Sequence, residues 1–331
     1  MKYFLEKILQ HQNLTTSESY KLMFSLMSGN NDDIEIASFL VAFRSKGETV
    51  DEITGFVRAM REKMIKLHTH SPAIDMCGTG GDASGTFNIS TAASFITAGA
   101  GVKVAKHGNR SMSSKSGSAD VLQALGISIN LDKETTSRNI EEIGLGFIFA
   151  PDYHPAMRHA IKARKSLGIR TVFNLLGPLC NPAEVQSQAT GIFNPKMTNK
   201  VALVLKKLGS KNIMVFSGLD GLDEISTIEE TKISEMKNRG EILTYNFSYK
   251  ELRLKQSKIK DLMGGSPKKN ATIIKNILEG EKGPKRDIAL LNAAAGIFVG
   301  EKNISFEEAF HKAIDSLDSL SALSVLKRLQ S

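Results

Sequence analysis

The stretch "DMCGTGGDASGTFNIST", residues 75–91, places four glycines within seventeen positions and leads directly into a run with helical character. Glycine allows positive φ and, because it has no side chain, lets backbone N–H groups come close to a ligand. A helix N-terminus after such a turn binds anions through its unpaired N–H groups. The stretch therefore predicts a phosphate-binding loop between a strand and a helix.

Two familiar phosphate loops do not fit this stretch. No Gly-Lys-Ser/Thr follows at the spacing of a Walker A loop, and the acidic residue expected on the second strand of a dinucleotide-binding fingerprint is absent. A glycine-rich turn alone is also typical of an ordinary tight connection between a strand and a helix. The phosphate interpretation therefore needs support from other parts of the chain.

A second polar loop, "KHGNRSMSSKSGSAD" at residues 106–120, also follows a strand-like run and ends at a helix start. Loops at the carboxyl ends of parallel strands face one crevice of an α/β sheet, so the two loops are expected to meet. The donors of this loop suit a ligand with more than one phosphate. They are Lys106, Arg110, Lys115 and the hydroxyls of Ser111, Ser113, Ser114 and Ser116.

A third loop, "GLDGLDEIS" at residues 218–226, carries adjacent Asp223 and Glu224 after another strand-like run. Magnesium usually takes one or two protein carboxylates together with phosphate oxygens of a substrate. An Asp-Glu pair alone is more often a solvated surface feature. Together with two phosphate loops, the pair favours a magnesium site.

The chain divides into three zones. Residues 2–67 carry apolar residues at helical spacing, with turn and cap residues in "TTSES", "GNNDD" and "GETVDE". After the proline of "HTHSPAID", strand-like and helical runs alternate, which predicts an α/β sheet. From about Asp287, two amphipathic helices are expected, at 287–300 and 305–330.

Composition limits the class of protein. The 331 residues are 41% apolar and 24% charged, which is typical of a folded globular chain. No apolar run approaches the about 20 residues of a membrane span, so a cytoplasmic location without membrane contact is expected. Cys77 and Cys180 are too few for a disulfide framework and receive no catalytic role. The net charge of +8 is compatible with nucleic-acid binding, anionic substrates or a solvated surface.

Taken together, the motifs resemble the anthranilate phosphoribosyltransferase family of tryptophan biosynthesis. The resemblance covers essentially the whole chain and rests on "CGTGGD", "FNIST", "KHGNRS", "SGSADVLQALG", "FIFAPDYHPAM", "GIRTVFNLLGPLCNP" and "GLDEIS", in that order. It implies transfer of the 5-phosphoribosyl group from phosphoribosyl pyrophosphate (PRPP) to the amine of anthranilate, with Mg²⁺ assistance.

The resemblance also implies a fold and an assembly. The fold is class III phosphoribosyltransferase-like: a small all-helical domain hinged to a larger α/β domain with a central, mostly parallel sheet. The implied boundaries are 1–70 for the helical domain, with a returning segment at about 165–185, and 71–331 for the PRPP-binding domain. A homodimer through the helical domain is expected.

Site residues follow from the resemblance by position. For PRPP they are Gly78, Gly81, Asp82, Thr86, Asn88, Ile89, Ser90, Thr91, Lys106, His107, Gly108, Asn109, Arg110, Ser111, Met112, Ser113, Ser114 and Ser118. For anthranilate they are Arg164 as partner of the carboxylate, Asn109 as a hydrogen-bond partner, Gly177 and Pro178 as a flat wall, and His107 and Gly78 nearby. The Mg²⁺ ligands are Ser90, Asp223 and Glu224.

No acid, base or nucleophile is expected among the side chains. Anthranilate's arylamine is nucleophilic while neutral, and loss of pyrophosphate needs alignment and charge stabilisation above all.

Two alternatives stay open at the level of sequence. One is a pyrimidine nucleoside phosphorylase of a related fold, against which "KHGNRS" and Arg164 argue. The other is a nucleic-acid-binding paralogue, which the positive charge permits. The paired Asp223 and Glu224, and the scarcity of aromatic residues for base stacking, argue against it.

Overall fold

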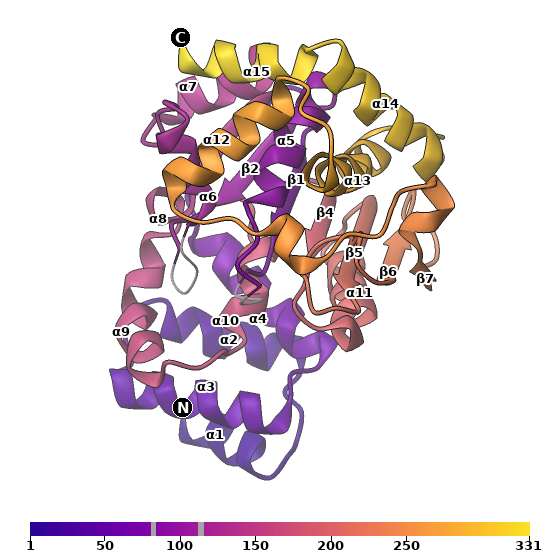
Figure 1. The fold of residues 1–331 in the computed structure, drawn as a ribbon. Helices are drawn as coiled ribbons and strands as arrows, with labels where there is room; N and C mark the ends of the chain where they lie inside the picture. The colour runs from indigo at the N-terminus through magenta and orange to yellow at the C-terminus, as the bar shows by residue number, and fades with distance from the viewer. Residues whose placement is uncertain (81–83, 112–115) are drawn as a thin grey trace.

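The computed structural model describes residues 1–80, 84–111 and 116–331. Four helices form a body at the N-terminal end, drawn in indigo in Figure 1: α1 (Lys2–Leu9), α2 (Thr16–Leu26), α3 (Asp33–Lys46) and α4 (Val50–Lys63). Three of them start with a capping box, in which a side chain and a glutamate three residues later each bind the other's backbone N–H. The pairs are Thr15–Glu18, Asp32–Glu35 and Thr49–Glu52. The predicted N-terminal helical unit is confirmed.

A seven-stranded sheet forms the centre of the larger part, in the order β3-β2-β1-β4-β5-β6-β7. The first five strands in chain order are parallel, and the last two pair antiparallel at one edge. Their bounds are β1 (Ile74–Gly78), β2 (Val104–Gly108), β3 (Leu145–Phe149), β4 (Ser187–Gly191), β5 (Asn212–Gly218), β6 (Thr231–Met236) and β7 (Leu243–Phe247). The mostly parallel sheet is confirmed; the antiparallel pair at its edge was not expected.

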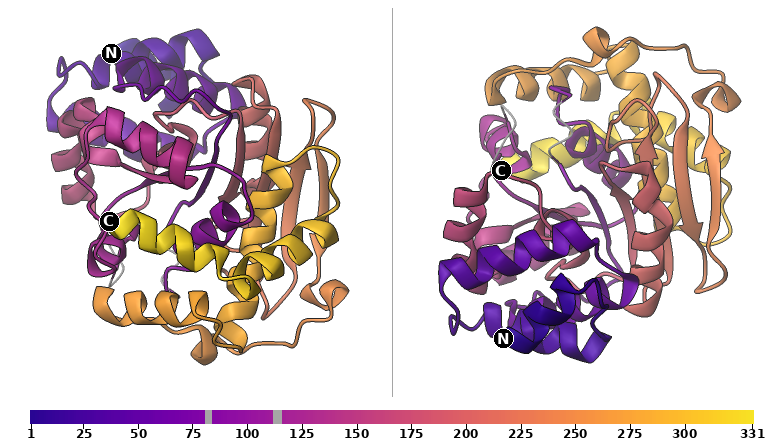
Figure 2. Two further views of the ribbon diagram at one scale, coloured as in Figure 1. Left: turned by 90° about the horizontal axis from the view of Figure 1, so that it is seen from above. Right: turned by 90° about the horizontal axis from the view of Figure 1, so that it is seen from below.

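Helices complete the chain around this sheet (Figures 1 and 2). They are α5 (Ile89–Gly99), α6 (Ser118–Ala124), α7 (Lys133–Arg138), α8 (Ala150–Tyr153), α9 (Arg158–Leu167), α10 (Phe173–Leu176), α11 (Thr198–Lys207), α12 (Pro267–Leu278), α13 (Pro284–Gly300), α14 (Phe306–Asp318) and α15 (Ser321–Gln330). A π-helical turn, η1 (Asn139–Ile143), follows α7, and 3₁₀ turns occupy η2 (Pro155–Met157), η3 (Gly177–Leu179), η4 (Pro195–Met197), η5 (Tyr249–Leu252) and η6 (Ile259–Leu262).

The single helix expected over residues 305–330 is wrong. The structure has two helices there, because Leu320 takes a left-handed conformation with φ of 62° between α14 and α15. A non-glycine residue in this region ends a helix, and the chain changes direction.

The centre of the sheet is buried on both faces, whereas the edge strand β7 is mostly exposed. Every residue of β5 is buried, and its side chains alternate between two cores, with Met214 and Phe216 on the side of α5 and α13. Ile213 and Val215 face the other core, which includes residues of α11 and of the N-terminal helices. Successive side chains of a strand point to opposite faces of the sheet, so a central parallel strand with helices on both faces must bury all of its side chains.

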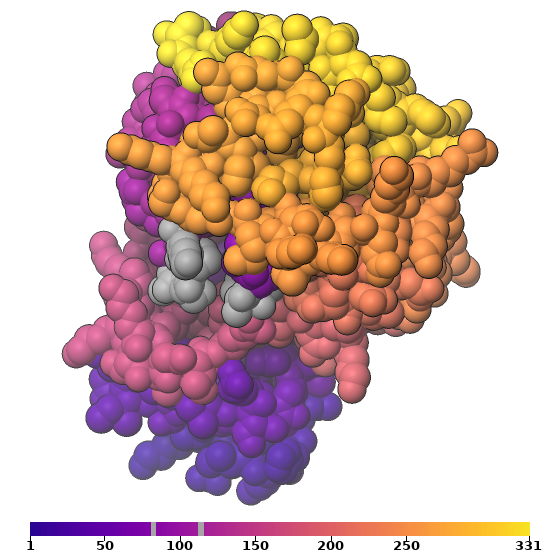
Figure 3. Space-filling view, in the orientation of Figure 1, coloured from indigo at the N-terminus to yellow at the C-terminus, as the bar shows by residue number. Residues whose placement is uncertain are grey.

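The N-terminal helical body is completed by a segment that comes later in the chain. Helix α9 packs on α3, and α10 on α4. Ala160, Phe173 and Leu176 are buried in the same core as α2–α4. In the space-filling view the segment around α9 lies directly above the indigo helices (Figure 3). The boundaries given above for the two domains stay a prediction.

The chain crosses between the helical body and the sheet at neighbouring positions. The backbone N–H of Ile65 donates to Tyr153 O over 2.8 Å, and that of Leu67 donates to Pro182 O over 3.0 Å. The Glu141 carboxylate then accepts the N–H groups of His70 and Ser71 at 2.7 and 2.8 Å. Three crossing segments therefore lie side by side, and one of them is fastened to the α/β part. None of the helices in the described part of the chain has the length and apolar character needed to cross a bilayer.

Candidate active site

The three predicted loops meet at the carboxyl ends of β1, β2 and β5. Strand order reverses direction beside β1, with β2 on one side and β4 on the other, and such a switch point is where α/β sheets bind ligands. Some of the predicted residues lie outside the described part of the chain: Gly81, Asp82, Met112, Ser113, Ser114 and Lys115.

The acidic turn packs directly on the glycine loop. The Asp223 carboxylate accepts the N–H of Gly80 at 2.7 Å, and Gly80 has a φ of +64°, which favours glycine. Gly78 does not take positive φ; it is needed because a Cβ there would lie 2.5 Å from Asp223 Oδ2. Gly191 at the end of β4 serves the same purpose, since a Cβ there would lie 1.7 Å from Asp223 O.

The same turn also reaches the start of α5. Glu224 Oε1 accepts the N–H of Ser90 at 3.2 Å. Asp223 therefore contacts one side of the first loop, and Glu224 contacts the other. The ammonium group of Lys106 donates to Met76 O at 2.7 Å and lies 3.3 Å from Ser90 O. Burial lowers the pKa of Lys106, and the nearby charge of Asp75 opposes that shift. Ser90, Lys106, Asp223 and Glu224 are therefore one cluster.

Two asparagines connect the first and second loops. Asn88 does not cap α5 with its side chain; its Nδ2 donates to Ser116 O at 3.1 Å. Its Oδ1 accepts from Asn270 Nδ2 at 2.8 Å. Asn270 is buried at the start of α12, and sequence reasoning missed it. The same missed segment forms a bridge to Thr86 through Met263, so it supports the glycine loop from outside.

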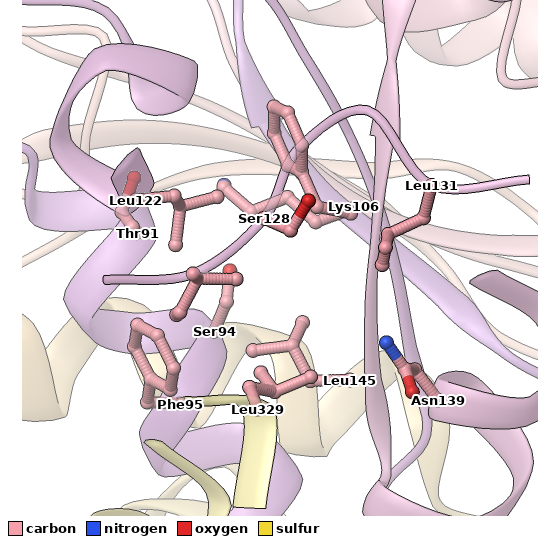
Figure 4. A pocket seen from close by; sticks show the side chains of 12 residues that line it. Thr91, Ser94, Phe95, Lys106, Leu122, Ser128, Leu131, Asn139, Leu145 and Leu329 are labelled. Carbon is pink, nitrogen blue, oxygen red and sulfur yellow. The ribbon is translucent and has the colours of Figure 1, made fainter. Parts of the chain in front are cut away.

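Two predicted PRPP residues have side chains that turn away from the crevice. Ile89 and Thr91 are almost fully buried in the core under α5. The hydroxyl of Thr91 has no hydrogen-bond partner among the described residues, and Thr91 lines, together with Lys106, a cavity of about 10 Å³ (Figure 4). This space holds about one water molecule and no substrate. Only the backbone of these two residues is available to a phosphate.

The second loop is organised by a carboxylate that sequence reasoning also missed. Asp120 accepts the N–H groups of Gly117 at 2.9 Å and Ser111 at 3.1 Å, and pairs with Arg110 at 3.0 Å. Burial alone would raise the pKa of Asp120, but these donors lower it below its ordinary value. Arg110, expected as a phosphate donor, is thus engaged by Asp120.

The described residues at the two ends of this loop also bond to each other. Ser118 Oγ and the N–H of Ala119 donate to Asn109 O at 3.3 and 3.2 Å, and Asn109 Oδ1 accepts the N–H of Arg110 at 2.7 Å. A Cβ at Gly108 would lie 2.3 Å from Ser118 Oγ. The two described ends of the loop are therefore joined directly, through Gly108, Asn109 and Ser118.

A different kind of surface lies on the other side of β2. The rings of His107 and His154 lie 5.1 Å apart between centroids, and each is only 8% exposed. The Nε2 atoms of both lack a hydrogen-bond partner among the described residues. Burial lowers the pKa of His107 to about 3 and that of His154 to about 4. Both rings are therefore neutral at physiological pH, and His154 is a further residue that the motifs did not single out.

The predicted anthranilate residues are on neighbouring elements. His107 contacts the backbone of Gly177, which begins η3, and the adjacent Pro178 is buried. Arg164, on α9, stacks its guanidinium over the ring of Phe173 at 5.0 Å, and burial lowers its pKa. Its guanidinium makes no ion pair or hydrogen bond with any residue that the structure describes, although its backbone carbonyl accepts the N–H of Gly168. The structure thus joins His107 to Gly177, whereas among the described residues no hydrogen bond joins Arg164 to His107 or Asn109.

The donor set at the acidic turn fits magnesium. Asp223, Glu224 and Ser90 offer carboxylate and hydroxyl oxygens, the ligands that this hard cation prefers. Within the described part of the chain, no three His, Cys, Asp or Glu side chains gather as a metal site of their own. Oxygens from a phosphate ligand would complete such a site, which is the usual arrangement for Mg²⁺.

Comparisons with known proteins agree with this geometry. Residues 2–64 match the family described as "Glycosyl transferase family, helical bundle domain". Residues 70–323 match "Glycosyl transferase family, a/b domain". The chain is 48% identical over 327 residues to the anthranilate phosphoribosyltransferase of Acetivibrio thermocellus, covering 98% of this chain and 94% of that protein. It is 49% identical to that of a Thermoanaerobacter species, covering 98% and 96%.

Solved structures give the same result. The anthranilate phosphoribosyltransferase of Thermus thermophilus superposes with a TM-score of 0.93 at 40% identity, with 98% of each chain covered. The yeast enzyme in complex with PRPP and Mg superposes with a TM-score of 0.89 at 27% identity, covering 99% of this chain and 96% of the other. These similarities favour a transferase over the nucleoside phosphorylase and nucleic-acid-binding alternatives.

Proposed function

The chain belongs to the anthranilate phosphoribosyltransferase family, and we propose that it carries out this family's reaction at the meeting point of the three loops. The reaction transfers the 5-phosphoribosyl group of PRPP to the amine of anthranilate and releases pyrophosphate. The observation that carries the assignment to these loops is the acidic turn. Its two carboxylates are held by backbone N–H groups of Gly80 and Ser90, on either side of the glycine loop.

PRPP would bind along the first and second loops. Backbone N–H groups between Gly78 and Thr91 and the ammonium of Lys106 would supply donors for the phosphates, and the second loop would bind the rest of the ligand. Because Ile89 and Thr91 bury their side chains, we assign them a backbone role only.

Anthranilate would bind on the His107 side. The neutral rings of His107 and His154 and the wall at Gly177 and Pro178 suit a flat aromatic acceptor. Arg164, whose cation has no carboxylate partner among the described residues, is the proposed partner of the anthranilate carboxylate. Asn109 is the proposed second hydrogen-bond partner.

Magnesium is the proposed cofactor, because the yeast relative was solved in complex with PRPP and Mg and the donor set here suits that ion. Asp223, Glu224 and Ser90 would hold it. When bound, the ion supplies positive charge that stabilises the departing pyrophosphate.

The protein's own contribution to the transfer is alignment and electrostatics. Breaking the bond between C1 of the ribose and pyrophosphate leaves positive charge on the sugar, and Lys106 and the loop N–H groups stabilise the anion that leaves. The arylamine attacks C1 while neutral and then loses its proton, so no strong general base is needed. Movement of the helical body toward the sheet at the three crossing segments would exclude water, which otherwise hydrolyses PRPP.

The direct test follows anthranilate fluorescence with purified protein, PRPP and Mg²⁺. Fluorescence should fall only when all three are present and should stop falling when Mg²⁺ is chelated. The double variant Asp223→Asn with Glu224→Gln is the matched control. No loss of fluorescence under any metal condition would contradict the proposed function.

We also propose that two copies of this chain associate through the helical body, as the family resemblance implies. Helix α3 buries Ile36, Phe39 and Phe43, yet leaves Ile34 77% and Val41 45% exposed. Ile34→Lys with Val41→Lys should halve the mass seen by light scattering, whereas Leu243→Lys, equally apolar and exposed on β7, should leave it unchanged. A monomeric parent protein would contradict the association, and an unchanged dimer in the α3 variant would place the interface elsewhere. The cytoplasmic location and the lack of a nucleic-acid partner stay predictions, testable by fractionation and by electrophoretic retardation of DNA.

A further inference from the structure

A buried asparagine on α13 forms hydrogen bonds with the backbone of the acidic turn. Asn292 is 1% exposed, and its Oδ1 accepts the N–H of Ile225 at 2.9 Å. Its Nδ2 donates to Ile225 O at 3.0 Å and to Ile288 O at 2.9 Å. One side-chain amide therefore binds both polar backbone groups of the residue that directly follows Glu224, much as a neighbouring strand would.

This arrangement leaves no polar atom of the amide unpaired. A buried amide must have its donors and acceptor satisfied, because an unmet group loses its hydrogen bonds to water without replacement. Asn292 meets that requirement through the turn and through its own helix, so the conformation of Ile225 and the position of the amide depend on each other. The side chain of Ile225 is fully buried, which fixes the turn further.

The same helix also holds the other half of the proposed metal site. The hydroxyl of Thr97 on α5 donates to Ala293 O at 3.1 Å, one residue beyond Asn292. Helix α5 carries Ser90 in its first turn, and α5 and α13 pack along one another. Helix α13 is thus a common support for the carboxylates and for the serine.

We propose that Asn292 is a positioning residue for magnesium: by fixing the main chain of Ile225, it sets the direction in which Asp223 and Glu224 present their carboxylates toward the glycine loop. The proposal rests on the proposed metal site at those two residues. Asn292 touches neither substrate nor ion in this scheme. It acts on the two carboxylates only through the backbone of Ile225.

A matched control separates this role from general stability. Asn212 is also a buried asparagine that bonds α13: its Nδ2 donates to Val299 O at 3.2 Å, and its Oδ1 accepts the N–H of Asn238 at 2.8 Å. It lies at the amino end of β5, and the acidic turn follows the opposite end of that strand. Asn212→Ala therefore removes a similar set of hydrogen bonds without touching the turn.

The experiment compares Asn292→Ala, Asn212→Ala and the double variant Asp223→Asn with Glu224→Gln. For Asn292→Ala, the Mg²⁺ concentration for half-maximal activity should rise about tenfold or more, the usual effect of losing a residue that orients metal ligands. The KM for anthranilate should stay within about twofold. Calorimetric titration of Mn²⁺ in the presence of pyrophosphate should show the same weakening without turnover. Asn212→Ala should lower the Tm and leave Mg²⁺ dependence unchanged.

A second variant keeps the test informative if Asn292→Ala does not fold. In Asn292→Asp, a protonated carboxyl can donate to Ile225 O and accept from its N–H, whereas the ionised form cannot donate. The deficit in Mn²⁺ affinity relative to the parent protein should therefore shrink as pH falls from 8 to 6. Equal Mg²⁺ dependence in Asn292→Ala and Asn212→Ala, or a deficit of Asn292→Asp that does not change with pH, would overturn the positioning role. Normal Mg²⁺ dependence in the Asp223 and Glu224 variant would overturn the metal site and this proposal together.

Discussion

The two sides of the candidate active site differ in how their polar groups are satisfied. On the phosphate side, Asp120, Asp223 and Lys106 are all hydrogen-bonded to the protein's own backbone. On the proposed acceptor side, the Nε2 atoms of His107 and His154 have no hydrogen-bond partner, and Arg164 has no carboxylate partner, among the described residues. The first side is built before the ligand arrives, which lowers the cost of reorganisation during the reaction. The acceptor side has polar groups that a ligand must satisfy. We therefore expect this side to determine which acceptor substrate binds.

The largest effect should come from the carboxylates of the phosphate side. Asp223→Asn with Glu224→Gln keeps side-chain shape but removes two negative charges, so folding should change little. Turnover should fall by at least about 10²-fold, because a metal at a departing pyrophosphate stabilises the transition state by several kcal/mol. Steady-state kinetics across Mg²⁺ concentrations would measure this. Normal kcat at ordinary Mg²⁺ would show that the turn is a structural connection.

The next effect should come from Arg164 on the acceptor side. Arg164→Ala should raise the KM for anthranilate about 10- to 100-fold and leave the KM for PRPP nearly unchanged. This factor corresponds to the loss of a charged hydrogen bond, which contributes about 1.5–3 kcal/mol. Lys165→Ala removes an exposed cation from the same helix and should change neither constant. If Arg164→Ala weakens both substrates equally, the residue supports the fold instead.

A smaller effect should follow when the second loop loses its organising charge. Asp120→Asn removes a carboxylate that binds Arg110, Ser111 and Gly117, which should cost about 1–1.5 kcal/mol and raise the KM for PRPP five- to tenfold. The KM for anthranilate should not follow. Asp32→Asn, at the capping box of α3, is the control and should affect stability alone. An equal rise in the KM for PRPP in Asp32→Asn would show that the effect is not specific to the second loop.

The smallest effect concerns the dependence of stability on pH. In the folded protein the pKa of His154 lies at about 4, below the ordinary value of about 6.5 that applies to the unfolded chain. Below pH 6.5 the unfolded state therefore binds more protons, and the free energy of unfolding falls as pH falls. Between pH 6.5 and 5.5 this histidine should remove about 1 kcal/mol.

Urea unfolding at several pH values would measure that slope. His154→Gln should flatten it, while His311→Gln, which removes an exposed histidine, should leave it as in the parent protein. An unchanged slope in His154→Gln would mean that His154 already finds a partner for its second nitrogen, and the contrast between the two sides would weaken.

The elements that local patterns specify were predictable. The capping pairs at Thr15, Asp32 and Thr49 are visible three residues apart, and β2, β3 and β5 were predicted as strand-like runs. The glycine loop and the Asp223–Glu224 pair were predicted as phosphate and magnesium sites from the chemistry of their residues, and these roles stay predictions. Gly78 was predicted for its backbone freedom, yet the structure requires glycine there because Asp223 packs against it.

The residues that were missed act through partners far away in the chain. Asn270 bonds Asn88 across 182 positions, and Asn292 bonds Ile225 across 67. Nothing in their immediate neighbours signals such a contact, because an asparagine in an apolar helix has the same local pattern whether it is a partner of a loop or not. Leu320 broke a predicted helix for a similar reason: its residue type gives no warning of a positive φ.

The late return of α9 and α10 to the N-terminal helices has a consequence for synthesis. Helices α1–α4 leave the ribosome first, but Ala160, Phe173 and Leu176, which fill their core, follow about a hundred residues later. Three strands of the sheet lie between these two parts of the chain. The first helices therefore keep apolar surface exposed while the sheet begins to form. A long loop of the nascent chain must close before either half of the protein is complete. Of all parts of the protein, this N-terminal body should be the one that most needs chaperone protection before release.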